Sequence, residues 1–255
     1  MGEIMKAIIL SAGQGSRLGA LTSDRPKCLI DFAGRSLLDR QLDTLAANGV
    51  SETIVVTGFN DHKIEEAIAK RTGGPKITTV YNPFYKVADN LGSLFVAREH
   101  LNEDTLVWNG DTLVSDSLMA EVIANKQQGI AVTIDRKPCY DDDDMKVVVG
   151  HDGRLHAIGK RLPMTTVNAE SIGLLAFRGD GPARFKQAIE DAIRQPDGTT
   201  VWYLRVIHHM AQKQDIFTLD INGHEWGEVD FPEDVARARE LCQRWDDQSG
   251  AVVAA

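Results

Sequence analysis

The sequence predicts an α/β fold, a Rossmann-like three-layer sandwich with a mostly parallel mixed central sheet. The first observation is that the first half alternates short apolar runs with amphipathic segments. This pattern indicates parallel strands joined by helices that cover both faces of a sheet. The second observation is a glycine-rich turn directly after the first apolar run. Such a turn lies where open α/β sheets bind their ligands.

The elements of the first half follow from hydrophobic periodicity and from residues that begin or end helices. Strands are expected at 7–10, 53–57, 77–81 and 105–108, and helices at 36–48, 61–70 and 92–100. Ser36 and Asp39 resemble a capping box at the start of the first helix, and Gly49 ends it.

The second half is more mixed. Strands are expected at 130–134, 145–149, 155–158, 172–177 and 216–221, and helices at 116–126, 182–194, 201–213 and 232–244. The turn His151-Asp152-Gly153 predicts a hairpin. We interpret residues 1–245 as one domain with two halves, 5–115 and 116–245, followed by a frayed tail at 246–255.

Composition limits the function. The chain has 255 residues and a formal net charge of −9, which argues against a nucleic-acid-binding protein. Its three cysteines are far apart and indicate a reducing compartment. The opening apolar stretch is too short for a signal peptide, and no run is long enough to span a membrane. We expect a cytoplasmic protein without a membrane partner; a homodimer is compatible with the sequence.

The glycine turn does not fit two common phosphate loops. A dinucleotide-binding fingerprint needs a third glycine where Leu18 stands, and Gly19 comes one residue late. A Walker loop needs glycine at the same position, followed by Lys-Ser or Lys-Thr. Both interpretations are therefore poor.

Two cations accompany the turn. Arg17 offers a forked donor, and Lys27 follows the stiff Pro26 ten residues later. Backbone N–H groups of a turn after a strand can also face an anion. A structural turn with two solvated cations is the simpler alternative, but the joint pattern favours a triphosphate site.

The stretch "KAIILSAGQGSRLGALTSDRPKC" resembles the opening of the nucleotidyltransferase superfamily, which makes activated NDP-sugars and CDP-alcohols. Members typically carry A-G-x-G-x-R-L, then P-L-T and P-K. Here Ser11 replaces the usual Ala or Gly and Ala20 the usual Pro, and neither change removes a charge. The resemblance extends to about Gln243. It implies that 5–115 is a nucleotide-binding half and 116–245 an acceptor-binding half. Its middle segments are most similar to the small cytidylyltransferases that act on phosphocholine or inositol 1-phosphate.

The resemblance implies roles for individual residues. Catalytic roles fall on Arg17, Lys27 and Lys160, and nucleotide contacts on Leu10, Ser11, Ala12, Gly13, Gln14, Gly15, Ser16, Asn90, Ser93 and Gly110. It also implies that Asp111, in "NGD", and Asp230, in "GEVD", hold one Mg²⁺, which prefers oxygen ligands.

Acceptor contacts are implied for Lys160, Glu170, Gly173, Trp202 and Tyr203. Each has a plainer alternative. Lys160 could be an ordinary surface lysine, and Trp202 and Tyr203 could be core residues. Asn90 and Ser93 could serve a helix N-terminus. Leu204 stands where phosphocholine enzymes tend to place an acidic residue, which weakens the case for a choline acceptor.

The resulting hypothesis is a Mg²⁺-dependent nucleotidyltransferase. It would transfer CMP from CTP to a small phosphomonoester, such as phosphocholine, an aminoethylphosphonate-like compound or inositol phosphate, and release pyrophosphate. The main alternative is a sugar-1-phosphate uridylyl- or thymidylyltransferase. The third hypothesis is a nucleotide-binding paralogue without catalytic activity.

One charged run receives no role. Asp141 to Asp144 places four carboxylates in a turn between expected strands, without the spacing of a calcium loop. We expect this run to be solvated.

Overall fold

The structure is a computed structural model that describes residues 5–253. The strands are β1 (Lys6–Leu10), β2 (Asp31–Phe32), β3 (Arg35–Ser36), β4 (Glu52–Thr57), β5 (Lys76–Tyr81), β6 (Thr105–Asn109), β7 (Thr112–Val114), β8 (Gly129–Asp135), β9 (Lys146–Val149), β10 (Leu155–Ile158), β11 (Ala169–Arg178), β12 (Phe217–Asp220) and β13 (Trp226–Glu228). The α-helices are α1 (Leu37–Ala47), α2 (Asp61–Ala69), α3 (Asn90–Ala97), α4 (Asp116–Ala124), α5 (Gly181–Ile193), α6 (Tyr203–Ala211) and α7 (Pro232–Val253). None of these helices is both long and apolar enough to cross a membrane.

A nine-stranded sheet runs through the molecule in the order β10-β9-β11-β6-β1-β4-β5, with β8 beside β11 and β12 beside β8. Strands β6, β1, β4 and β5 are all parallel. Antiparallel pairing enters with β11, which pairs with β6, β8 and β9. The predicted mixed sheet and α/β class are confirmed, and so is the predicted hairpin, which is formed by β9 and β10.

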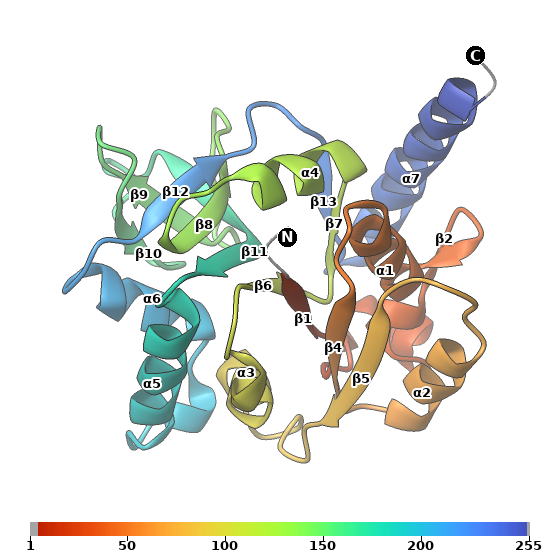
Figure 1. The fold of residues 1–255 in the computed structure, drawn as a ribbon, viewed down its shortest axis with the longest axis horizontal. Helices are drawn as coiled ribbons and strands as arrows, with labels where there is room; N and C mark the ends of the chain where they lie inside the picture. The colour runs from red at the N-terminus through yellow and green to blue at the C-terminus, as the bar shows by residue number, and fades with distance from the viewer. Residues whose placement is uncertain (1–4, 254–255) are drawn as a thin grey trace.

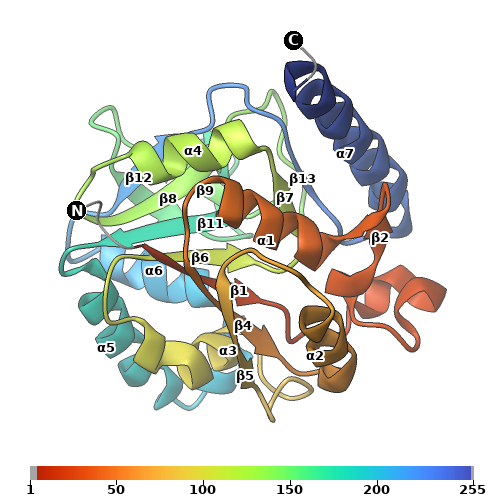
Figure 2. The ribbon, with the colours of Figure 1, turned by 45° about the vertical axis from the view of Figure 1, so that its right-hand side comes forward.

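Helices cover both faces of this sheet, which gives the predicted three layers (Figures 1 and 2). In β1, Ile8 belongs to a buried cluster that includes residues of α3, α5 and α6, whereas Ala7 and Ile9 belong to a second cluster that includes residues of α1 and α4. Because successive side chains of a strand point to opposite faces, a strand buried on both faces reads as a continuous apolar run. This explains the sequence pattern at 7–10.

The last helix corrects the predicted tail. Helix α7 continues to Val253, whereas we expected residues 246–255 to fray. Asp246, in the expected tail, pairs with Arg40 at 2.7 Å and also with Arg35. These two ion pairs attach the helix to the segment 35–40, and small residues in 246–253 do not prevent a helix. Residues 254 and 255 lie outside the described part.

Four short strands, β2, β3, β7 and β13, were not predicted from the sequence. β7 and β13 have three residues each, too few for a periodic pattern, yet they form their own antiparallel ladder. Glu228 pairs with Thr112 in this ladder, and the Val229 amide donates to the Asp111 carbonyl at 3.0 Å. This ladder places "NGD" beside "GEVD", which are far apart in the sequence.

Candidate active site

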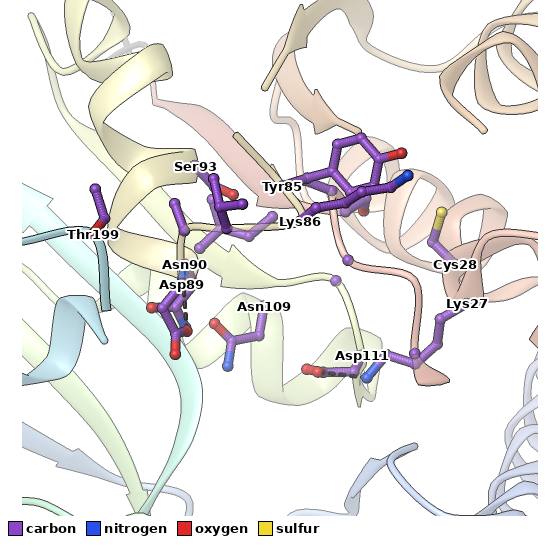
Figure 3. A pocket seen from close by; sticks show the side chains of 18 of the residues that line it. Lys27, Cys28, Tyr85, Lys86, Asp89, Asn90, Ser93, Asn109, Asp111 and Thr199 are labelled. Atoms are coloured by element: carbon purple, nitrogen blue, oxygen red, sulfur yellow. Dashed lines mark hydrogen bonds and ion pairs between the residues drawn. The ribbon is translucent and has the colours of Figure 1, made fainter. Parts of the chain in front are cut away.

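A cavity of about 520 Å³ opens where the parallel strands β1 and β6 end (Figure 3). Ten residues with predicted roles line it: Leu10, Ser11, Ala12, Gly13, Gly15, Lys27, Asn90, Ser93, Gly110 and Asp111. The segment Tyr85–Asp89 and the backbone around Thr199 close its other side. Gln14 and Ser16 belong to the predicted loop but do not line the cavity. The predicted nucleotide loop therefore surrounds a cavity large enough for a ligand.

Gly15 explains how the loop holds Lys27. Its φ of 72° is left-handed, and a Cβ added there would lie 2.9 Å from the Cβ of Lys27. The Thr22 hydroxyl donates to the Gly15 carbonyl at 2.8 Å and closes the turn. Glycine is thus required both by the backbone angle and by the lysine stem that packs on it.

Gly110 serves a different contact, and we predict that Gly110→Ala destabilises the fold. A Cβ at this position would lie 2.4 Å from the Leu10 carbonyl oxygen and 2.7 Å from the Ser11 Oγ. Overpacking of this kind typically costs about 1–3 kcal/mol of the free energy of unfolding. Urea denaturation should detect the loss. The matched control is Gly13→Ala, where no atom lies within 4 Å of the added Cβ; an equal loss in both variants would contradict the prediction.

Lys27 lies between the two predicted metal carboxylates. Its Nζ is 2.8 Å from Asp111 Oδ2 and 2.8 Å from Asp230 Oδ1. Only 14% of its side chain is exposed. Burial opposes the charged ammonium, but the charges of Asp111 and Asp230 outweigh it and raise the pKa of Lys27. The structure thus directs both carboxylates at one positive charge.

The ion pairs continue on both sides of this lysine. Arg17 Nη1 lies 3.0 Å from Asp230 Oδ2 and 3.0 Å from Asp143 Oδ2. Asp143 Oδ1 in turn lies 2.5 Å from Lys160 Nζ. The three cations predicted to bind phosphate, Arg17, Lys27 and Lys160, are therefore joined by carboxylates into one network.

Asp143 belongs to this network although the acidic run is mostly exposed. The hydrogen bond from Lys160 and the charge of Arg17 hold the pKa of Asp143 below its usual value. Its neighbour Asp144 pairs with Lys137 at 2.8 Å. The expected solvation is confirmed for Asp141, Asp142 and Asp143, which are exposed. The sequence did not predict the ion pairs, because the partners come from distant segments that local charge patterning cannot reveal.

Glu228 is a third carboxylate of the site that the sequence interpretation missed. It stands two residues before Asp230, and the buried Val229 lies between them. In extended chain, residues two apart point to the same side. Desolvation, with the charges of Asp111 and Asp230, raises the pKa of Glu228. The spacing in "GEVD" is the sequence signal that could have identified it.

Helix α3 begins earlier than expected. Asp89, rather than Asn90 or Ser93, caps this helix, and its carboxylate accepts a hydrogen bond from the backbone N–H of Asn90 at 2.7 Å. The side-chain oxygen Oδ1 of Asn90 accepts a hydrogen bond from the backbone N–H of Tyr203 at 2.9 Å. Ser93 is buried, and its Oγ accepts from Asn82 Nδ2 at 3.1 Å. The capping alternative is therefore wrong for Asn90 and Ser93.

The predicted acceptor residues do not share one surface. Lys160 Nζ lies 5.3 Å from the centroid of the Trp202 ring, and the Trp202 side chain acts to lower the pKa of Asp89, which lines the cavity. Glu170 is buried and pairs with Lys137 at 2.9 Å, and burial raises its pKa to about 7. Lys160 and Trp202 thus stand near the cavity, whereas Glu170 faces Lys137.

Gly173 and Tyr203 also lie outside the cavity lining. A Cβ at Gly173 would lie 2.4 Å from the Nδ2 of Asn109, and Tyr203 is fully buried with its hydroxyl 3.1 Å from Asn109 Oδ1. Both residues lie against Asn109, which lines the cavity. Direct contact of Glu170, Gly173 or Tyr203 with an acceptor stays a prediction.

Comparison with known proteins decides the family. The sequence profile of the MobA-like NTP transferase domain matches residues 7–171. The chain belongs to the MobA-like NTP transferase family. Among its relatives are a CMP-5'-(3-aminopropyl)phosphonate synthase of Streptomyces rubellomurinus, 30% identical over 92% of this chain, and a bifunctional IPC transferase and DIPP synthase of Aquifex aeolicus, 24% identical over 91%. This NTP transferase chain spans 38% and 50% of the lengths of those two relatives.

Solved structures agree on the fold of the NTP transferase chain. The inositol-1-phosphate CTP transferase of T. maritima superimposes with a TM-score of 0.80 at 22% identity, over 96% of this chain and 97% of that one. The CTP:phosphocholine cytidylyltransferase of Streptococcus pneumoniae gives a TM-score of 0.76 at 20% identity, over 94% and 99%. Most of the chain therefore shares the fold of these structures.

Proposed function

We propose that this protein transfers CMP from CTP to a small phosphomonoester or phosphonate and releases pyrophosphate. The observation that carries the proposal is the network of Arg17, Lys27 and Lys160 beside the cavity. Three cations around one ligand site suit a substrate with several phosphate groups. The printed names of a phosphonate synthase and of a CTP:phosphoglutamine cytidylyltransferase of Campylobacter jejuni, 24% identical over 68% of this chain, support the choice of CTP.

In this proposal, each half of the chain binds one of the two substrates. Residues 5–115 hold the triphosphate through the loop, Arg17 and Lys27, and residues 116–245 bring the acceptor through Lys160. An oxygen of the acceptor phosphate attacks the α-phosphorus, and the bond to the pyrophosphate oxygen breaks. Because the attacking oxygen is already anionic, positioning and charge neutralisation suffice, without a covalent enzyme intermediate.

The residues present fit one Mg²⁺. Asp111 and Asp230 direct oxygen atoms at a single cation, the ammonium of Lys27. Within residues 5–253 no group of three His, Cys, Asp or Glu side chains is arranged to hold a metal alone. Mg²⁺ commonly binds through one or two carboxylates with phosphates completing its shell. Bound there, it would neutralise charge on the α-phosphate, and Lys27 would be released toward the triphosphate.

Two alternatives remain for the experiment to separate. A UTP–glucose-1-phosphate uridylyltransferase of Haloferax volcanii is 29% identical over 45% of this chain, which favours a sugar-nucleotide product as the second candidate. A silent paralogue is disfavoured, because the three cations and both metal carboxylates are present and connected.

The choice of nucleotide is directly testable. We expect CTP to release pyrophosphate in the presence of a phosphomonoester or phosphonate acceptor, with UTP, dTTP, ATP and GTP roughly 5- to 150-fold poorer in kcat/KM. A site that pairs the cytosine N4 amino group leaves a buried group unpaired with uracil, which costs about 1–3 kcal/mol. A panel with phosphocholine, aminoalkylphosphonates, inositol 1-phosphate and glucose 1-phosphate checks this. Higher activity with UTP and glucose 1-phosphate would replace the proposal by the sugar-nucleotide alternative.

A further inference from the structure

Asn109 is a cavity residue that the sequence interpretation left without a role. It ends β6, two residues before Asp111, and lines the cavity. Figure 3 shows its side chain between Asp111 on one side and Asp89 and Asn90 on the other. It therefore stands between the carboxylate expected to hold the metal and the side of the cavity nearest Trp202 and Lys160.

Tyr203 sets the direction of the Asn109 amide. The phenol is fully buried, and burial raises the pKa of Tyr203, so that its hydroxyl keeps the proton. This hydroxyl donates to Asn109 Oδ1 at 3.1 Å. With the oxygen held by tyrosine, the Nδ2 of the same amide is left to donate elsewhere.

Gly173 holds the amide from a second side. Its φ of 74° belongs to the left-handed region, and a Cβ would lie 2.4 Å from Asn109 Nδ2. The missing side chain leaves the space that the amide nitrogen occupies. The backbone N–H of Tyr203 donates a hydrogen bond to Asn90 Oδ1, which attaches Tyr203 to the start of α3. Asn90, Gly173 and Tyr203 thus form a support for Asn109.

A neutral donor suits this place. The Asp111 and Asp230 carboxylates carry negative charge around the expected metal, and a phosphoryl oxygen entering between them and Lys160 needs hydrogen-bond donors. An amide N–H supplies one without competing for the metal, and a donor to a charged oxygen contributes more than a neutral pair.

We propose that Asn109 Nδ2 donates a hydrogen bond to an oxygen of the acceptor phosphate or phosphonate, and that Tyr203 is a positioning residue that aims this donor. This inference rests on the proposed function. The donor would hold the acceptor while one of its oxygens forms the bond to the α-phosphorus and pyrophosphate departs with the electron pair of the broken bond.

Asn109 variants test the donor. Asn109→Ala is expected to lower kcat/KM for the acceptor by roughly 10- to 100-fold, which is the loss expected when one hydrogen bond to a charged group is removed. The Kd of CTP with Mg²⁺, measured calorimetrically without acceptor, should stay within about 2-fold. Asn109→Asp keeps the shape and the oxygen that accepts from Tyr203 but replaces the donor by a carboxylate, so its loss should exceed that of alanine. Acceptor kinetics of Asn109→Asp equal to wild type would overturn the proposal, as would a loss confined to CTP binding.

Tyrosine variants test the positioning role. Tyr203→Phe should raise the acceptor KM about 3- to 10-fold, and the double variant with Asn109→Ala should be no worse than Asn109→Ala alone, because coupled residues are not additive. Tyr81→Phe, on a half-exposed tyrosine of β5, is the matched control. Additive losses would overturn the positioning role.

The proposed function is tested separately in the same assay. All variants are measured with the nucleotide and acceptor that wild type prefers. Wild-type preference for UTP and glucose 1-phosphate would overturn CTP as the substrate, while the split between acceptor and nucleotide parameters would still decide the role of Asn109.

Discussion

Replacing Lys27 with alanine is expected to lower kcat/KM on the order of 10²-fold or more, because the ammonium would neutralise charge that develops on the triphosphate. The structure adds a second effect. Lys27 is largely buried between Asp111 and Asp230, so its removal takes away the cation that lies between the two carboxylates, while the pairing of Arg17 with Asp230 remains. We therefore expect the ligand-free variant to melt several degrees below wild type, with Mg²⁺ restoring part of the loss.

Two measurements separate these effects. Steady-state kinetics at saturating Mg²⁺ report the catalytic loss, and thermal melting with and without Mg²⁺ reports the electrostatic one. Lys213→Ala, which removes an exposed lysine at the end of α6, is the matched control. Wild-type turnover of Lys27→Ala would remove this lysine from the site, whereas a Mg²⁺-independent melting temperature would argue against a shared cation position.

Asp111→Asn and Asp230→Asn are expected to have the largest effects, each lowering kcat on the order of 10³-fold. Each removes one of the two carboxylates that share the cation. If both hold one Mg²⁺, each variant also needs a much higher Mg²⁺ concentration for half-maximal activity. Since both residues serve the same ion, the double variant should be scarcely worse than either single one.

The Mg²⁺ dependence of turnover in the three variants provides the measurement. Asp24→Asn, which changes an exposed carboxylate three residues before Lys27 in the sequence, is the control. An unchanged Mg²⁺ requirement in both single variants would refute the shared metal position, even if turnover fell.

Most of the secondary structure follows from the sequence because it depends on local periodicity. The run at β1 predicts a strand buried on both faces, and the Ser36 hydroxyl accepts from the Asp39 amide at 3.0 Å, as the capping pattern predicts. The loop with Gly15, Arg17 and Lys27 is also local, since all three lie within 13 residues. A short motif of this kind therefore predicts the family and the loop that lines the cavity.

Only the tertiary structure decides which charges meet. Lys27 and Asp230 are separated by 203 positions, and Arg17 and Asp143 by 126, so no local pattern predicts either pair. Three-residue strands bring "NGD" to "GEVD", and the turn with Asp143 reaches the loop cations only after the sheet has formed. Likewise, Tyr203 and Gly173 read as acceptor contacts in sequence, whereas packing sets them against Asn109. Sequence by itself determined the elements and the nucleotide loop, because those depend on near neighbours; the alternating network of cations and carboxylates depends on distant segments that only the folded sheet aligns.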